Sequence, residues 1–174
     1  MFYIRKANEN EFEKVRDFYY SLIDMMQTSK YFPGWEKGIY PTDEYLKEAI
    51  LKKELFVGVH DTKIIASMVV NREFNESYAK VKWSTSFAEE EVMIIHILGV
   101  LPTYGGKGYA KKLVKYAFEY AKQNAKKAVR LDVLGGNLPA EKLYTGLGFQ
   151  YVDTIQMYYE DTGWTDFKLY EYIL

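Results

Sequence analysis

A continuous apolar stretch from Val92 to Leu101 constrains what this chain can fold into more than any other segment. His96 is the only residue in it with an ionisable side chain, and Pro102 follows its last residue. A strand that is covered on one face alternates apolar and polar residues, whereas a strand covered on both faces reads as an unbroken apolar run. The stretch is too short to cross a membrane as a helix. It therefore predicts a central strand that is buried on both faces.

Helix and strand patterns alternate on either side of this central strand. Helix-start signals and apolar residues at helical spacing predict helices over residues 12–26, 42–50, 110–122 and 138–146. Runs of β-branched and aromatic residues predict further strands over residues 2–4, 55–59, 63–70, 128–134, 149–159 and 164–174. Residues 71–91 show no regular pattern. This order of elements predicts an α/β fold with an antiparallel hairpin on each side of the central strand.

Composition argues against several classes of protein. The 174 residues contain 23 Lys and Arg against 24 Asp and Glu, and this net charge of −1 argues against nucleic acid as a partner. The absence of cysteine excludes disulfides and a cysteine nucleophile, and the two histidines do not form a zinc motif. The chain turns polar within a few residues of its start, which offers no apolar core for a signal peptide, and it has no membrane-spanning run. We therefore expect a cytoplasmic protein without a metal, folded as a single domain over residues 1–174.

A glycine-rich turn separates the central strand from the helix that follows it. The glycines at 105, 106 and 108 place little side chain in front of the free N–H groups of that helix, and Lys107 adds a positive charge. Backbone amides at the positive end of a helix dipole bind anions such as pyrophosphate. The same glycines also fit a helix entry that needs only a flexible backbone. Neither of the common phosphate motifs, GxxxxGK[ST] and GxGxxG, matches this segment.

Four consecutive segments together resemble the GNAT superfamily of acetyl-coenzyme A-dependent N-acetyltransferases. They are similar to that family's fourth strand, its pyrophosphate loop, its fifth strand and the helix that carries its acid tyrosine, and they read IHILGVLP, YGGKGYAKKLV, VRLDVLGGN and LPAEKLYTGLGF. The resemblance is specific over residues 92–152 and compatible over the flanks. It implies the GNAT fold, in which a mixed, mostly antiparallel sheet is flanked by helices and splayed between its fourth and fifth strands. Acetyl-coenzyme A enters that splay in the family.

The resemblance also implies roles for individual residues. The main chain of Leu98 and Val100 would hold the pantetheine arm, and the Val100 N–H would polarise the thioester carbonyl. Asn137 would contact the pantetheine, and it also suits the N-cap of the last helix. Tyr144 stands where the family's general acid contacts the cofactor and protonates the departing thiolate. The pyrophosphate would bind to the loop and first helical turn formed by Gly105, Gly106, Lys107, Gly108, Tyr109 and Ala110.

Gly105 departs from the family pattern. The family's loop has Arg or Gln at this position, followed by two residues, a glycine, one residue, and a glycine or alanine. Gly108 and Ala110 match that pattern, whereas Gly105 does not. The missing side chain would cover a phosphate, so its loss predicts weaker cofactor binding with the fold retained.

Acetyl transfer to an amine needs a base, because the amine is protonated at neutral pH and must lose a proton before it attacks. His96 is the candidate, since it interrupts an apolar strand and imidazole transfers protons near pH 7. A buried histidine with one hydrogen bond to the main chain accounts for the same pattern. Glu91, in the acidic run before the strand, and a chain of water molecules are the alternatives.

The expected function is direct transfer of the acetyl group of acetyl-coenzyme A to a primary amine of a small molecule or a peptide. Trp35 and Tyr40 fall in the region that helps to form the acceptor side in this family, or they form a small hydrophobic cluster. Because of Gly105, the alternative is a non-catalytic module of the same fold that binds or senses acyl-coenzyme A. The resemblance is compatible with a homodimer, and we expect no nucleic acid or membrane partner.

Overall fold

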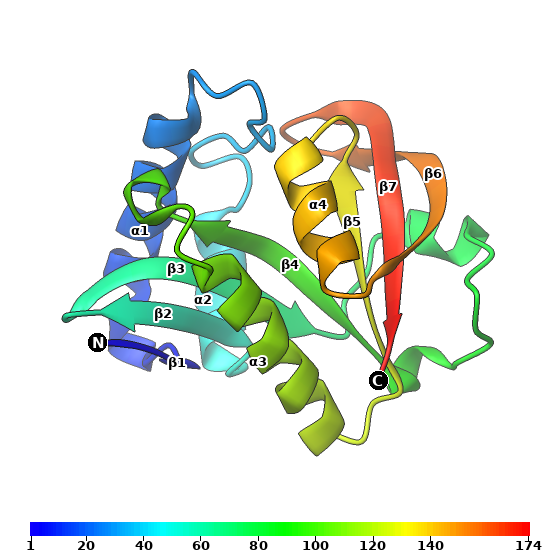
Figure 1. Cartoon of the computed structure of the whole chain (residues 1–174). Helices are drawn as coiled ribbons and strands as arrows, with labels where there is room; N and C mark the ends of the chain where they lie inside the picture. The colour runs from blue at the N-terminus through cyan, green and yellow to red at the C-terminus, as the bar shows by residue number, and fades with distance from the viewer.

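One seven-stranded sheet runs through the computed structural model, which describes all 174 residues (Figure 1). The strands lie in the order β1-β2-β3-β4-β5-β7-β6. All neighbouring strands are antiparallel except β4 and β5, so the prediction of a mixed, mostly antiparallel sheet is confirmed. The bounds are β1 Phe2–Lys6, β2 Leu55–His60, β3 Lys63–Asn71, β4 Val92–Val100, β5 Ala128–Leu134, β6 Gln150–Tyr159 and β7 Gly163–Ile173.

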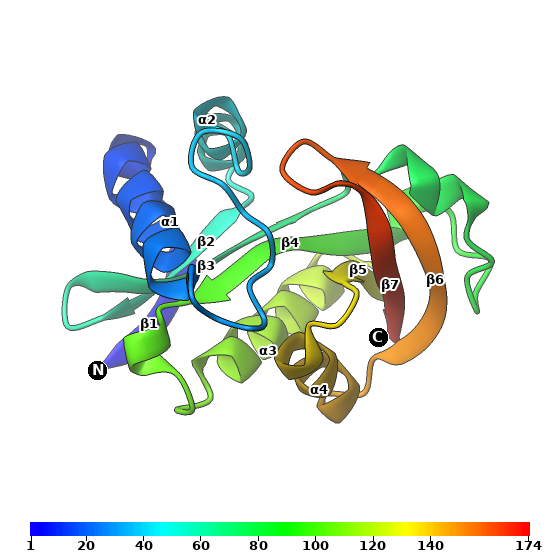
Figure 2. The same cartoon turned by 90° about the horizontal axis from the view of Figure 1, so that it is seen from above.

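Four helices cover the two faces of the sheet, with α1 and α2 on one face and α3 and α4 on the other (Figure 2). Their bounds are α1 Phe12–Met26, α2 Asp43–Leu51, α3 Tyr109–Gln123 and α4 Leu138–Gly146. Each of the longer helices buries one stripe at helical spacing; in α1 this stripe contains Val15, Tyr19 and Leu22. None of the four helices combines the length and the apolar character needed to cross a membrane.

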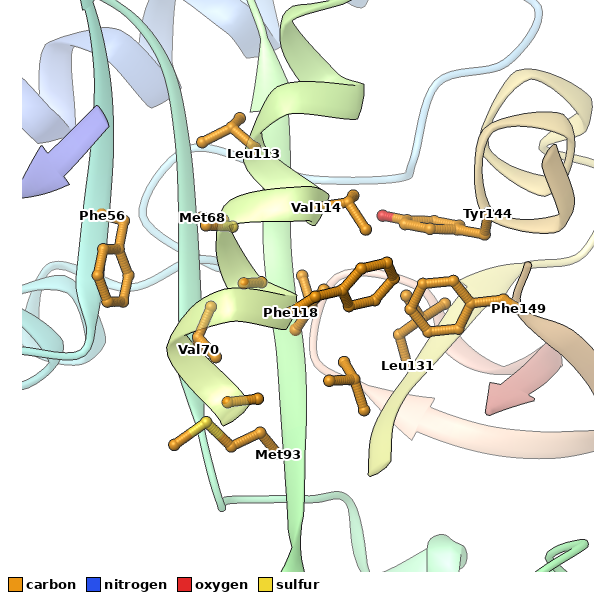
Figure 3. Close-up of a cluster of buried hydrophobic side chains, with 14 of the residues drawn as sticks. Phe56, Met68, Val70, Met93, Leu113, Val114, Phe118, Leu131, Tyr144 and Phe149 are labelled. Carbon is orange, nitrogen blue, oxygen red and sulfur yellow. The ribbon is translucent and has the colours of Figure 1, made fainter. Parts of the chain in front are cut away.

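The prediction that the central strand is buried on both faces is confirmed for residues 92–95 and Ile97, whereas His96 and residues 98–100 are only half-buried. Met93 and Ile95 of β4 belong to a cluster of 18 buried residues that packs the sheet against α3 and α4. Figure 3 shows part of this cluster, in which strand side chains face Val114 and Phe118 of α3. On the opposite face, Ile97 belongs to a second cluster of 15 buried residues beneath α1 and α2. Two packed layers therefore hold β4 in place.

The parallel strands β4 and β5 separate soon after they begin. They pair only from Val92 opposite Ala128 to Ile94 opposite Arg130, although both strands continue well beyond these residues. A bulge in β4 accompanies the separation, because its register with β3 shifts next to Ile97, which has a φ of +43°. The predicted splay between the fourth and fifth strands is confirmed.

A buried ion pair anchors the irregular segment between β3 and β4 to the sheet. Arg130 of β5 and Glu171 of β7 are opposite each other and only 7% and 1% exposed, and the Arg130 Nε donates to a Glu171 oxygen at 2.7 Å. The hydroxyls of Ser84 and Thr85 donate to the same carboxylate. The Trp83 ring lies 4.2 Å from the Arg130 guanidinium carbon. These contacts connect the segment directly to β5 and β7.

Arg130→Ala is expected to lower the free energy of unfolding by about 3 kcal/mol, because it leaves the Glu171 carboxylate buried without its cation. Urea unfolding at neutral pH measures this loss. The double variant Arg130→Met with Glu171→Leu removes both charges and is expected to recover much of the stability. An equal loss in the double variant would contradict this account.

Candidate active site

A cavity of about 320 Å³ lies where β4 and β5 separate. One wall consists of β4 from Ile95 to Val100, the end of β5 and the first turns of α3 and α4. The opposite wall comes from α1, the α1–α2 loop (residues 27–42) and the β6–β7 hairpin. The tip of that hairpin lies beside the α1–α2 loop in both views (Figures 1 and 2). The two walls therefore join segments that are far apart in the sequence.

The edge of β4 that faces the cavity has unpaired backbone groups. The Leu101 N–H donates to the Ile65 carbonyl on the β3 side at 2.9 Å. Successive N–H groups of an extended strand point to opposite edges, so the N–H groups of Val100 and Leu98 point toward the β5 side. No strand pairs with that edge beyond Ile94. An extended ligand can therefore add to β4 there as a neighbouring strand would.

The glycine turn before α3 leaves a group of backbone donors free. Gly106 and Gly108 have φ values of +73° and +77°, and Gly108 is the N-cap of α3. No acceptor in the protein binds the N–H groups of Gly106, Lys107 or Gly108. The first amides of α3 are also unpaired within the helix. This arrangement fits the pyrophosphate of coenzyme A, because the donors converge at the positive end of the helix dipole.

The predicted cofactor residues divide into two groups. Six of the predicted site residues line the one cavity: His96, Leu98, Val100, Ala110, Asn137 and Tyr144. The others lie outside it, in the turn and first helical residue immediately before Ala110: Gly105, Gly106, Lys107, Gly108 and Tyr109. The Tyr109 ring packs on Phe2 with ring centres 4.3 Å apart, which holds this side chain against β1 at the start of α3.

Asn137 caps α4 and also lines the cavity. Its side-chain oxygen accepts the Ala140 N–H at 3.4 Å, which satisfies one amide at the start of the helix. No protein acceptor binds the Asn137 side-chain N–H groups. Both interpretations of Asn137 from the sequence are therefore compatible, since one oxygen serves the helix and the amide nitrogen can donate to a ligand.

Tyr144 reaches the cavity from α4 and is only 8% exposed. Figure 3 shows its hydroxyl directed toward Val114 of α3, with Phe149 beside its ring. No protein group makes a hydrogen bond with this hydroxyl. Burial, assisted by the nearby charge of Asp132, raises the pKa of Tyr144 above its ordinary value. The phenol therefore stays protonated at neutral pH and can donate its proton to a ligand in the cavity.

His96 lies in the wall of the cavity and belongs to a hydrogen-bonded network. The Asn71 amide nitrogen donates to Glu54 at 3.1 Å, which fixes the Asn71 oxygen as the acceptor for His96 Nε2 at 2.8 Å. This network assigns the proton to Nε2 and leaves Nδ1 as the basic nitrogen. Burial lowers the pKa of His96 to about 4, outweighing the opposite effect of Glu73. Glu91, the alternative base, pairs with Lys127 at 2.5 Å and does not line the cavity.

The lowered pKa of His96 predicts a loss of stability in acid. His96 takes up a proton less readily in the folded protein than in the unfolded chain. The folded state is therefore favoured above pH 6.5, and this contribution to the free energy of unfolding is lost as the pH falls toward 4. The full effect is about 3 kcal/mol. Urea unfolding between pH 7 and pH 4 is expected to show a steeper loss in the wild type than in His96→Gln. Parallel curves for the two proteins would contradict the lowered pKa.

The two walls of the cavity each contribute one carboxylate that sequence reasoning missed. Asp132 of β5 accepts hydrogen bonds from the hydroxyls of Tyr78 at 2.6 Å and Tyr159 at 3.0 Å. Asp161, in the β6–β7 turn, has a buried oxygen without a donor, and burial raises its pKa to about 6. Trp35 and Tyr40, the aromatic residues noted in the sequence, line the same wall as Asp161. Asp132 could have been suspected because it interrupts an apolar strand as His96 does.

Comparison with known proteins identifies one matching family model and two curated proteins that match part of the chain. Residues 19–149 match the model of the acetyltransferase (GNAT) family. An uncharacterised N-acetyltransferase from Methanocaldococcus jannaschii is 32% identical over 74 residues, which are 42% of this chain and 33% of that protein. The N-alpha-acetyltransferase RimI of Mycobacterium tuberculosis is 33% identical over 69 residues, which are 40% of this chain and 42% of RimI. The chain therefore matches less than half the length of each of these curated relatives.

Solved structures share the fold over the whole chain. NAA60 of Arabidopsis thaliana, in complex with acetyl-CoA, has a TM-score of 0.75 at 20% identity and covers 100% of this chain and 99% of its own. The putative acetyltransferase yncA of Salmonella typhimurium, with its cofactor acetyl-CoA, has a TM-score of 0.72 at 16% identity. The match covers 100% of this chain and 94% of yncA. The family model covers most of the sequence, including the splayed strands and the glycine turn. This chain therefore belongs to the acetyltransferase (GNAT) family.

Proposed function

We propose that this chain, acting as one domain, transfers the acetyl group of acetyl-coenzyme A directly to a primary amine. The unpaired edge of β4 beside the buried Tyr144 is the observation that carries this proposal. It brings a backbone donor and a protonated phenol to one cavity. The family match and the two neighbours whose titles include acetyl-CoA support the choice of cosubstrate.

The β4 edge and the turn before α3 would bind different parts of the cosubstrate. The main chain of Leu98 and Val100 holds the pantetheine arm, and the Asn137 side chain donates to it. The free amides from Gly106 to Ala110 hold the pyrophosphate, with Lys107 supplying a positive charge. These contacts place the thioester carbonyl where the Val100 N–H can donate to its oxygen.

The chemical step then needs three groups of this chain. Acetyl-coenzyme A supplies an activated acyl group, and the amine nitrogen forms a bond to the acyl carbon as the carbon–sulfur bond breaks. The Val100 N–H stabilises the charge that develops on the oxygen, which in other enzymes is worth about 3 to 4 kcal/mol per donor. Tyr144 gives its proton to the departing thiolate. The amine must also lose a proton; because the pKa of His96 is about 4, its imidazole is a weak base at neutral pH and can only relay that proton to solvent, as a chain of water molecules can.

Thermal unfolding with and without acetyl-coenzyme A tests the binding half of this proposal. Ligand at a hundred times its dissociation constant adds about 2.7 kcal/mol, which for a chain of this size raises Tm by about 5 to 10 °C. Release of free thiol on addition of amines tests the catalytic half. A Tm increase with amine-dependent thiol release supports the enzyme, and no increase in Tm would contradict it.

Gly105 favours a second candidate function, a non-catalytic module that binds acyl-coenzyme A. Its φ of −61° and ψ of 160° are open to any residue, but a Cβ added there would lie only 3.0 Å from the Pro102 carbonyl oxygen, so this turn is built around a glycine. Without a long polar side chain at this position, the phosphates have one contact fewer. This candidate predicts a Tm increase with acetyl-coenzyme A and no thiol release with any amine.

A further inference from the structure

The charged side chains that line the cavity are all acidic. Asp132 and Asp161 are the two acidic residues that line it, and no lysine or arginine lines it. His96 adds no positive charge near neutral pH, because burial keeps its pKa at about 4. A ligand that brings a carboxylate into this space would therefore find no cation to pair with it. A ligand that brings an ammonium would find two partners.

Asp132 is held in a fixed position with one oxygen available. The hydroxyls of Tyr78 and Tyr159 both donate to Oδ2, and no protein donor binds Oδ1. Asp132 also lies close enough to Tyr144 for its charge to affect that phenol. Asp132 and the proposed general acid line the same cavity, so a ligand there can lie near both.

Asp161 supplies a second unpaired oxygen from the other wall. Its Oδ1 is buried and makes no hydrogen bond in the protein, while the backbone N–H groups of Asp161 and Thr162 favour the charged form of the carboxylate. The hairpin that carries it is packed on the α1–α2 loop: a Cβ added to Gly34 would lie 2.6 Å from Thr162 Cγ2. Glu36 of the same loop is the other acidic group whose charge acts on Asp161. No positive group of the protein offsets these charges in the cavity.

Aromatic rings fill the space around the two carboxylates. Tyr40 and Tyr159 lie with ring centres 5.4 Å apart, and Tyr31 and Trp35 line the same side. Aromatic faces attract ammonium groups and also cover methylene chains. The lining as a whole is mainly apolar, with 16 hydrophobic residues among 25. This combination suits a flexible hydrocarbon chain that ends in a positive charge.

On the basis of the proposed function, we propose that the acceptor is a diamine or polyamine whose remaining protonated nitrogens pair with the carboxylates of Asp132 and Asp161. The amine that reacts must be unprotonated, so the charge that pairs with the carboxylates belongs to a different nitrogen. One amine forms the amide as the carbon–sulfur bond breaks and loses its proton to solvent through His96 or water. The coenzyme leaves as the thiol with the proton of Tyr144, and Tyr144 regains a proton from solvent. The second nitrogen stays protonated throughout.

Three amines of similar chain length test this inference: 1,4-diaminobutane, butylamine and 4-aminobutanoate. They place an ammonium, a methyl group or a carboxylate at the far end. Hydrogen bonds to charged groups predict a kcat/KM for the diamine about 10- to 100-fold above that for butylamine. The carboxylate compound is expected to be the poorest substrate. Similar kcat/KM values for all three amines would overturn the inference and leave the proposed function standing.

Asparagine variants test whether the two carboxylates cause the preference for the diamine over butylamine. Asp132→Asn and Asp161→Asn each keep the size of the side chain and remove its charge, so each is expected to lower the ratio of diamine to butylamine kcat/KM. Asp166→Asn, an exposed residue of β7 outside the cavity, is the matched control and is expected to keep the ratio. An unchanged ratio in both cavity variants would overturn the assignment. No acetylation of any amine, despite a Tm increase with acetyl-coenzyme A, would overturn the proposed function itself.

Discussion

Gly108→Val is expected to abolish the Tm increase that acetyl-coenzyme A gives the wild type. Gly108 has a φ of +77° at the N-cap of α3, and a β-branched residue in that conformation is strained by about 1 to 2 kcal/mol. The added side chain also stands in front of the free amides that would hold the pyrophosphate. We expect cofactor binding to weaken by at least about 100-fold, which removes roughly 2.7 kcal/mol of ligand stabilisation. Thermal unfolding with saturating acetyl-coenzyme A measures this loss.

Gly38→Val is the matched control for this variant. Gly38 also has a positive φ, +75°, and open space around it, but it lies in the α1–α2 loop away from the start of α3. It is expected to lose comparable stability in the absence of ligand and to keep the Tm increase with acetyl-coenzyme A. A normal Tm increase in Gly108→Val would contradict the assignment of the pyrophosphate to this turn.

Tyr144→Phe is expected to lower kcat by about 100-fold or more, because general acid catalysis typically contributes that much. The variant removes only the hydroxyl, which has no hydrogen-bond partner in the protein, so the fold and the packing against Phe149 are expected to remain. The Tm increase with acetyl-coenzyme A is expected to stay close to that of the wild type. Steady-state thiol release with a saturating amine measures the change in kcat.

Tyr172→Phe controls for loss of a hydroxyl from the same hydrophobic core. Tyr172 stacks on Phe118 with ring centres 4.0 Å apart and does not line the cavity. It is expected to keep the wild-type kcat. Equal kcat values for Tyr144→Phe and the wild type would show that the thiolate leaves without help from this phenol.

Local signals in the sequence were sufficient to predict the individual strands and helices and the glycine turn before α3, whereas the arrangement of the sheet and the proposed roles of the cofactor residues came from the family resemblance. The apolar run from Val92 to Leu101 became β4, and the glycine turn became the start of α3. Both depend on residues that are close together in the chain, so their patterns can be recognised directly. The bulge at Ile97 was not predicted, because a β-branched residue is disfavoured at positive φ and only the surrounding packing holds it there.

The acceptor side could not be predicted in the same way, because it is assembled from distant segments. Tyr40 and Tyr159 meet across 119 positions of sequence, and Tyr78 reaches Asp132 from the irregular segment before β4. No local pattern marks such pairs, and the 17 tyrosines of the chain offer too many candidates. Asp161 became notable only when the structure showed its buried, unpaired oxygen at the tip of a hairpin.

The most direct test of amine acetylation follows free thiol and N-acetylated product in one sample of protein, acetyl-coenzyme A and amine. The account predicts that both products appear together in equal amounts, only when an amine is present, and at similar rates in the wild type and Tyr172→Phe. It predicts a much lower rate in Tyr144→Phe. A Tm increase with acetyl-coenzyme A but no thiol release with any amine, the diamine included, would contradict the account and identify a binding module.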